Sequence, residues 1–114
     1  MVNETRPRVR EITVDEARAL LAANPAAILV DVREDSEWQA GRAAGAIHIG
    51  KGVLERDLER QIPDANAEIL FYCGGGFRSI LAADAAQRIG YRQVRSIAGG
   101  YKKMAAGGWE IALG

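Results

Sequence analysis

The sequence is poor in cysteine and histidine and carries no net charge, and each shortage argues against a class of structure or function. A single cysteine among the 114 residues rules out an internal disulfide and gives no sign of an oxidising compartment. Fifteen basic and fifteen acidic side chains balance, so the composition does not support a general nucleic-acid binder. With one cysteine and one histidine, and no metal-ligand spacing around them, we expect no metal and no cofactor.

The sequence also lacks long hydrophobic runs. No apolar stretch approaches the ~18 residues of a membrane-spanning helix, so we expect no membrane partner. The segment Met1–Arg8 lacks the apolar region of a secretory signal. We therefore expect a cytoplasmic protein of one domain, with residues 1–10 as a flexible lead-in and residues 11–114 as the domain.

Short apolar runs alternate with helical patterns along the chain. Thr13–Glu16 has a capping-box pattern that predicts a helix, which Asn24–Pro25 ends. Ser36 is expected to cap a second, short helix. Apolar spacing predicts further helices over residues 54–62, over residues 81–89 and after residue 100, and strands over residues 27–32, 46–49, 68–72 and 93–97. The alternation predicts an α/β fold with a central, mainly parallel sheet.

The single cysteine lies in the stretch Tyr72–Ser79, which reads Y-C-G-G-G-F-R-S and joins an expected strand to an expected helix. Ligands of open α/β sheets bind at the carboxyl ends of strands, and Cys73 occupies such an end. Gly74, Gly75 and Gly76 let the backbone curl so that its N–H groups converge on an anion, helped by the helix dipole.

This setting predicts a nucleophilic thiol. The positive field of the loop favours the thiolate of Cys73, which is the reactive form. Arg78 offers a planar set of donors that suits an oxyanion. A lone cysteine after an apolar strand is usually a small core residue, and a glycine-rich turn alone is weak support. The combination of strand, cysteine, glycines, arginine and helix is more specific and favours an anion-handling thiol.

Three motifs, in order, resemble those of the single-domain rhodanese-like sulfurtransferases. Asp31–Glu34 followed by Glu37-Trp38 is similar to the family's D-V-R-E-x-x-E-aromatic motif. Residues 72–79 are similar to its C-x-x-G-x-R-S active loop. Gly90–Val94 and Gly99-Gly100 are similar to its G-Y-x-x-V…G-G tail.

The resemblance covers residues 12–112 and implies a rhodanese-like fold, a central parallel sheet with helices on both faces. It also implies an enzyme, a thiosulfate sulfurtransferase. Cys73 would attack the outer sulfur of thiosulfate or a similar small anionic donor, and sulfite would leave. The resulting persulfide would pass its sulfur to a thiol, such as glutathione, thioredoxin or a protein thiol, or to cyanide in an assay.

The resemblance assigns roles to the residues around Cys73. Arg78 would help to hold both the loop and the anion. Arg33 and Glu37 would form a structural ion pair, and Asp31 would brace the site from the neighbouring strand. The loop N–H groups would cradle the persulfide, and the expected substrate-binding residues are Gly74, Gly75, Gly76, Phe77, Arg78 and Ser79.

The sequence departs from the family pattern at two places. The usual G-H-I-P-G-A turn appears as Gly41–Ala46 with an added cation, Arg42. The tryptophan that usually follows the glycine pair is replaced by Met104, which we expect to fill the core. Phe77 is expected to point outward from the loop and shape its entrance.

The sequence is also compatible with other functions. A related fold carries cysteine-dependent phosphatases and arsenate reductases, in which Cys and Arg lie one residue further apart than Cys73 and Arg78; the shorter loop suits a sulfur better than a phosphate. A thioredoxin-like redox role would need a second cysteine to resolve a disulfide, and the chain has only one. A non-catalytic rhodanese-like interaction or regulatory module often lacks the cysteine that this chain keeps. His48 is expected to be a strand-end residue without a chemical role, although a Cys-His pair is conceivable.

Overall fold

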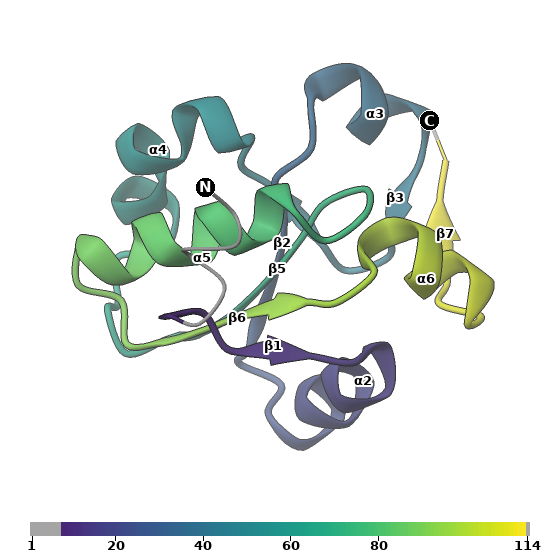
Figure 1. Ribbon diagram of the computed structural model, residues 1–114, viewed down its shortest axis with the longest axis horizontal. Helices are drawn as coiled ribbons and strands as arrows, with labels where there is room; N and C mark the ends of the chain where they lie inside the picture. Colours follow the sequence, from purple (N-terminus) through teal and green to yellow (C-terminus); the bar gives the residue numbers. More distant parts are fainter. Residues whose placement is uncertain (1–7, 114) are drawn as a thin grey trace.

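The computed structural model describes residues 8–113, which form helical layers around one parallel sheet (Figure 1). The sheet has five strands in the order β1-β6-β5-β2-β4, and each neighbouring pair is parallel. Its strands are β1 (Glu11–Ile12), β2 (Ile28–Asp31), β4 (Ile47–His48), β5 (Glu68–Tyr72) and β6 (Gln93–Ile97). The predicted α/β fold with a mainly parallel sheet is confirmed, and the four predicted strands correspond to β2, β4, β5 and β6.

Helices cover both faces of the sheet, as expected (Figure 1). One face carries α2 (Val14–Ala23) and α6 (Gly100–Ala106). The other carries α4 (Leu54–Gln61), preceded by the short 3-10 helix η2 (Lys51–Val53), and α5 (Arg78–Arg88). The remaining helix, α3 (Asp35–Ala40), follows β2 directly.

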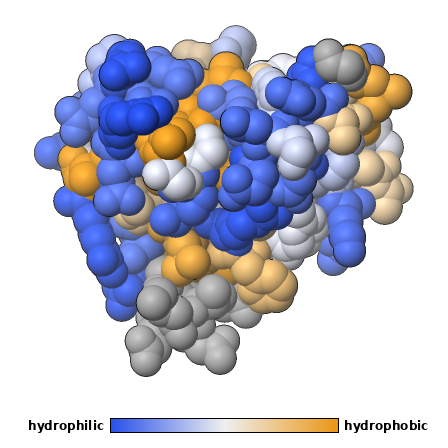
Figure 2. Space-filling model, turned by 90° about the horizontal axis from the view of Figure 1, so that it is seen from above, coloured by the Kyte–Doolittle hydropathy of each residue, from blue (hydrophilic) through white to orange (hydrophobic). Residues whose placement is uncertain are grey.

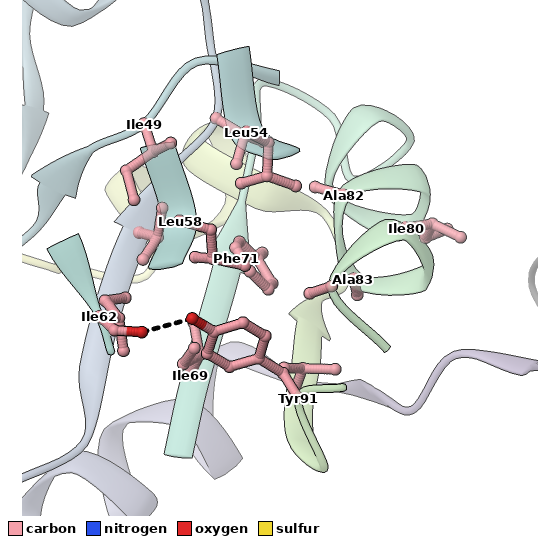
Figure 3. Close-up of a cluster of buried hydrophobic side chains, with 14 of the residues drawn as sticks. Ile49, Leu54, Leu58, Ile62, Ile69, Phe71, Ile80, Ala82, Ala83 and Tyr91 are labelled. Carbon is pink, nitrogen blue, oxygen red and sulfur yellow. Dashed lines mark hydrogen bonds between the residues drawn. The ribbon is translucent and has the colours of Figure 1, made fainter. Parts of the chain in front are cut away.

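The two faces of β5 pack into different parts of the core because side chains alternate along a strand. Ile69 and Phe71 pack with residues of α4 and α5, in the cluster drawn in Figure 3. Leu70 and Tyr72 pack with residues of α2 and α6. Cys73 follows in the alternation and lies in the same cluster as Phe71. The register of the strand therefore directs the thiol toward the α4 and α5 face.

The start of α2 was predicted correctly, whereas the start of α3 was not. Thr13 Oγ1 accepts from Glu16 N at 3.1 Å and Thr13 N donates to Glu16 Oε1 at 2.8 Å, which completes the capping box. The predicted cap at Ser36 is wrong, because the cap is Glu34, two residues earlier, and the helix begins at Asp35. Glu34 N donates to Glu37 Oε1 at 3.0 Å, so Glu37 is fixed at the third helical position.

A second sheet, of two antiparallel strands, was not predicted. It pairs β3 (Arg42–Ala43) with β7 (Ile111–Ala112). Ala44 N also donates to Glu110 O at 2.8 Å. This pairing joins segments far apart in the sequence, and it brings the end of the described chain onto the turn that departs from the family pattern.

The expected lead-in is partly packed into the fold. Residues 1–7 lie outside the described residues, but Val9 is 7% exposed and belongs to the core beside α4 and α5. Arg8 Nε donates to Asp84 Oδ1 on α5 at 3.3 Å, and Ser96 N donates to Arg10 O at 2.9 Å. Within the expected lead-in, Arg8 therefore contacts α5, Val9 packs in the core and Arg10 pairs with β6, while the division into lead-in and domain stays a prediction.

The face seen from above is mostly hydrophilic, with apolar atoms in small separate patches (Figure 2). Among the described residues, the large apolar side chains that are exposed are Phe77, Ile89 and Leu113. Phe77 is the one that belongs to the expected active loop. Within the described part of the chain, no helix is long and apolar enough to cross a membrane.

Tyr91, which follows the turn after α5, supports the end of α4. Its hydroxyl donates to the buried carbonyl of Ile62 (Figure 3). We expect Tyr91→Phe to lower the free energy of unfolding by about 1–3 kcal/mol, because the carbonyl loses its partner while the ring stays. Urea unfolding followed by circular dichroism measures this, with Tyr91→Leu expected to cost more. An unchanged midpoint in Tyr91→Phe would mean that the bond adds nothing to stability.

Candidate active site

The single cysteine lies where β5 ends and the loop to α5 begins. Cys73 is 1% exposed, and its Sγ accepts a hydrogen bond from Gly76 N at 3.1 Å. Gly76 has φ +98°, a left-handed value that side chains with a Cβ rarely adopt. The glycine therefore turns its N–H group back toward the sulfur, as expected of a curled loop.

Helix α6 binds the loop through two backbone hydrogen bonds. Tyr101 N donates to Cys73 O at 2.7 Å, and Lys102 N donates to Gly74 O at 3.2 Å. These first-turn N–H groups have no acceptor inside their own helix, so the loop carbonyls satisfy them. In a trans peptide the C=O group and the next N–H group point in opposite directions. The N–H groups of Gly74 and Gly75 therefore face away from α6.

The glycine pair at the start of α6, Gly99 and Gly100, makes this contact possible. A Cβ on Gly100, whose φ is +57°, would lie 2.3 Å from Cys73 O. A Cβ on Gly76 would lie 3.0 Å from Gly99 N. The loop at residues 73–76 and the Gly99-Gly100 pair therefore pack backbone against backbone. A side chain on Gly76 or Gly100 would overlap the backbone of the other segment.

Arg78 and Glu37 form a bidentate ion pair that joins α5 to α3. Nη1 of Arg78 lies 2.7 Å from Oε1 of Glu37, and Nη2 lies 3.1 Å from Oε2. The hydrogen bond from Arg78 is the main reason that the pKa of Glu37 falls to about 2, and the same bond raises the pKa of Arg78. Both groups are therefore charged at neutral pH, and the pair fixes the start of α5.

The expected ion pair between Arg33 and Glu37 is wrong. Arg33 instead binds Asp31, with Nη2 2.8 Å from Oδ2 and the backbone N 2.8 Å from Oδ1. Arg33 is 4% exposed, donates to Gly41 O, and lies 4.1 Å from the ring centroid of Tyr101. The carboxylate of Asp31 accepts from both the backbone N–H and the guanidinium of Arg33, whereas Glu37 binds Arg78. Arg33 thus joins the end of β2 to the end of α3 and to α6.

The remaining loop residues differ in how far they are buried. Ser79 is buried, and its Oγ is 3.6 Å from Cys73 Sγ. Phe77 is 58% exposed, in agreement with an outward position, while its influence on the entrance stays a prediction. A Cβ on Gly74 would lie 3.1 Å from Arg78 Nη2, so the arginine rests against a backbone without a side chain.

His48 lies beside α3. Its ring stacks on Trp38 with centroids 4.9 Å apart, and its Nε2 is 2.8 Å from Arg33 O. Arg42, from the turn that departs from the family pattern, lies 4.8 Å from the ring centroid of Trp38. Met104 is fully buried with residues of α2, so its expected place in the core is confirmed. Trp38 thus contacts both His48 and Arg42, which links α3 to β4 and β3.

Two features of the site were missed in the sequence. One is the pair of α6 N–H groups that hold the loop, which no side-chain pattern reveals. The other is Ser96 on β6, whose Oγ is 2.7 Å from Ser79 Oγ. Ser96 is in step with the buried Val94 on an alternating strand, so a polar residue at an inward position was the available signal.

The arrangement presents a buried sulfur with backbone N–H donors and a cation nearby. Such a site can stabilise a thiolate, a persulfide or the anion that attacks or leaves it. The thiol of Cys73 is the group on which this chemistry depends. Within residues 8–113, no group of three or more His, Cys, Asp or Glu side chains is placed to hold a metal ion.

Comparison with known families identifies the domain. The sequence pattern of the rhodanese-like domain matches residues 13–106, which include β2, β5 and the Cys73 loop. The chain belongs to the rhodanese-like domain family. The rhodanese-like fold expected from the three motifs is thus confirmed.

This rhodanese-like domain has relatives of different kinds. It is 31% identical over 104 residues to the human thiosulfate:glutathione sulfurtransferase, a match that covers 81% of this chain and 90% of the relative. It is 32% identical over 92 residues to the tRNA uridine(34) hydroxylase of Protochlamydia amoebophila (strain UWE25), covering 75% of this chain. The chain spans only 28% of that hydroxylase. The names of the relatives support a sulfurtransferase family.

Among solved structures, a protein of unknown function from Rhodopseudomonas palustris CGA009, described as a possible tyrosine phosphatase, has the same fold. The TM-score is 0.84 at 30% identity, and the match covers 97% of this rhodanese-like domain and 90% of that chain. The fold alone therefore does not distinguish sulfur transfer from phosphate chemistry, and the loop around Cys73 has to be compared with what each reaction needs.

The contact between α6 and the loop predicts a strong effect of Gly100→Ala. The added Cβ would overlap Cys73 O at a positive φ, so we expect unfolding to become easier by on the order of 2 kcal/mol or more. Differential scanning calorimetry measures the change. Gly52→Ala is the matched control, because a Cβ there meets nothing within 4 Å. Equal melting temperatures for the two variants would contradict this account of the glycine pair.

The Arg78–Glu37 pair predicts a pH-dependent difference between wild type and Glu37→Gln. The pKa of Glu37 is lowered from 4.5 to about 2, so its stabilising effect is present above pH 4.5 and is lost as pH falls toward 2. Because the side chains of the pair are 37% exposed, we expect a loss of about 1 kcal/mol or less at pH 7.

Thermal unfolding of wild type and Glu37→Gln at a series of pH values tests this. The difference in melting temperature should shrink as the carboxylate of Glu37 is protonated in acid. Asp15→Asn serves as a control for the loss of an exposed carboxylate, because the Asp15 side chain is 94% exposed. A wild-type advantage that persists unchanged at pH 2 would contradict the assignment of the ion pair.

Proposed function

We propose that this protein is a sulfurtransferase that carries a sulfane sulfur on Cys73. The thiolate attacks the outer sulfur of thiosulfate, a new S–S bond forms, and the S–S bond of thiosulfate breaks. Sulfite leaves with the electron pair, and Cys73 becomes a persulfide. The observation that carries the proposal is the hydrogen bond of 3.1 Å from Gly76 N to Cys73 Sγ, inside a loop in which the carbonyls of Cys73 and Gly74 accept from α6.

The second half of the reaction needs an external thiol. An acceptor thiolate attacks the outer sulfur of the persulfide, and Cys73 leaves as a thiolate. The chain has one cysteine, so no second thiol of its own can resolve the persulfide. Glutathione, thioredoxin or a protein thiol fits this step, and cyanide replaces it in an assay. A relative named thiosulfate:glutathione sulfurtransferase supports this order of donor and acceptor.

The residues of the loop have different roles in the proposed reaction. The N–H groups from Gly74 to Ser79 hold the charge on the persulfide and on the leaving anion. Arg78 fixes the loop through Glu37 and adds positive charge near Cys73, with which it interacts. Because its donors are shared with Glu37, the backbone of the loop supplies most of the anion recognition. Phe77 borders the entrance.

A cysteine-dependent phosphatase or arsenate reductase is the second candidate, favoured by the likeness to a possible tyrosine phosphatase. Such a reaction needs a cradle large enough for a tetrahedral oxyanion and a free arginine fork. Four residues separate Cys73 from Arg78, and both terminal nitrogens of Arg78 bind Glu37. A short loop with an occupied arginine suits a single sulfur better. A non-catalytic interaction module remains the third candidate.

The proposed reaction also supports the cytoplasm as its location. The catalytic form of Cys73 is a free thiolate, and cytosolic glutathione and thioredoxin keep thiols reduced. The same pool supplies the proposed acceptors. Fractionation of cells that express a tagged chain would check this placement.

Intact-mass spectrometry after incubation with thiosulfate tests the proposal. Wild type should gain one sulfur, about 32 Da, which a reducing thiol removes, whereas Cys73→Ser should gain nothing. The same pair of proteins is then incubated with glutathione persulfide and with an aryl phosphate. Phosphate release that depends on Cys73 would favour the phosphatase. No adduct from either sulfur donor, together with a stable protein partner in a pull-down, would favour the interaction module.

A further inference from the structure

Two buried serines form a chain of hydroxyl groups that ends at Cys73. Ser79 Oγ lies 3.6 Å from Cys73 Sγ and 2.7 Å from Ser96 Oγ. Both serines are fully buried, Ser79 in the first turn of α5 and Ser96 on β6. Among the described residues, every buried side-chain nitrogen and oxygen atom has a hydrogen-bond partner, and the two serine hydroxyl groups are among them.

The protons of the two hydroxyl groups fit one direction better than the other. Each serine has a single proton, and Ser79 is the one partner that the described residues offer to Ser96 Oγ. If Ser79 donates to Ser96, the proton of Ser96 has no acceptor in a buried place, which is costly. If Ser96 donates to Ser79, the proton of Ser79 is directed to Cys73 Sγ and both protons are used.

This direction suits a sulfur that only accepts. A thiolate has no proton and accepts from Ser79 Oγ as well as from Gly76 N, 3.1 Å away. Hydrogen bonds in a chain strengthen one another in a medium of low dielectric constant. A Ser79 hydroxyl that accepts from Ser96 is thus a better donor to the sulfur than one that does not.

We propose that Ser96 is a positioning residue that acts through Ser79 to favour the anionic form of Cys73. It touches no substrate and transfers no proton. Its hydroxyl fixes the direction of the Ser79 proton, first toward the attacking thiolate and later toward the thiolate that leaves when an acceptor takes the sulfur. This catalytic consequence rests on the proposed sulfur transfer, whereas the effect on the thiol itself does not.

The test is the pH dependence of Cys73 alkylation by iodoacetamide in wild type and Ser96→Ala. Only the thiolate reacts, so the rate follows the fraction of Cys73 that is ionised. We expect the midpoint of the Ser96→Ala profile to move to higher pH and the rate below that midpoint to fall roughly two- to tenfold, the range for one lost hydrogen bond. A role in packing alone would lower the melting temperature and leave the midpoint in place.

Further variants separate these effects. Val94→Ala, on the same strand, should reduce stability without moving the midpoint, because Val94 packs in the core with α4 and α5 and is part of no hydroxyl chain. Ser96→Ala added to Ser79→Ala should cause no further shift, since Ser96 acts through Ser79. Ser96→Cys keeps a similar volume but offers only a weak donor, so it should shift the midpoint in the same direction as Ser96→Ala.

The outcomes are distinct. A wild-type midpoint in both single variants of Ser96, with Cys73 labelling followed by peptide mass spectrometry, would overturn the proposal, as would additive shifts in the double variant. The alkylation profile needs no sulfur donor. If wild type takes no sulfur from thiosulfate or from glutathione persulfide, the proposed function fails while the profile still decides whether Ser96 orients Ser79.

Discussion

Two backbone hydrogen bonds between α6 and the active loop, from Tyr101 N to Cys73 O and from Lys102 N to Gly74 O, decide which way the loop faces. They turn the loop carbonyls away from the sulfur side, and because a peptide is planar they turn the next N–H groups the other way. The first residue of α6 is a glycine because any side chain at Gly100 would collide with the loop. The surroundings of the Cys73 sulfur are thus built largely from backbone, which α6 and the loop orient jointly.

The charged residues near the site serve two purposes that depend on their burial. Arg33 and Asp31 are buried and bound to each other, so breaking that pair would leave a charge without a partner inside the protein. Arg78 and Glu37 are partly exposed, so their pair costs less to break and links the loop to α3. The buried pair fixes the framework between β2 and α6, while the exposed pair holds the first residue of α5.

Much of the fold follows from local patterns. The apolar runs that became β5 and β6, the capping box at Thr13, and the break after residue 62 each depend on neighbouring residues, so the sequence predicted them. The prediction at Ser36 was wrong because Glu34 and Glu37 form an alternative cap at the same place. The strands β3 and β7 were missed because their pairing joins segments far apart in the chain.

For the site, the sequence by itself determined the chemical groups: one thiol at the end of a strand, three glycines after it, and an arginine before a helix. Local order along the chain suffices for this, because strand, turn and helix are short-range features. Only the tertiary structure decided the partners. Glu37 met Arg78 rather than Arg33, and Ser96 met Ser79, because those contacts join residues 41 and 17 positions apart and depend on how the sheet and helices pack.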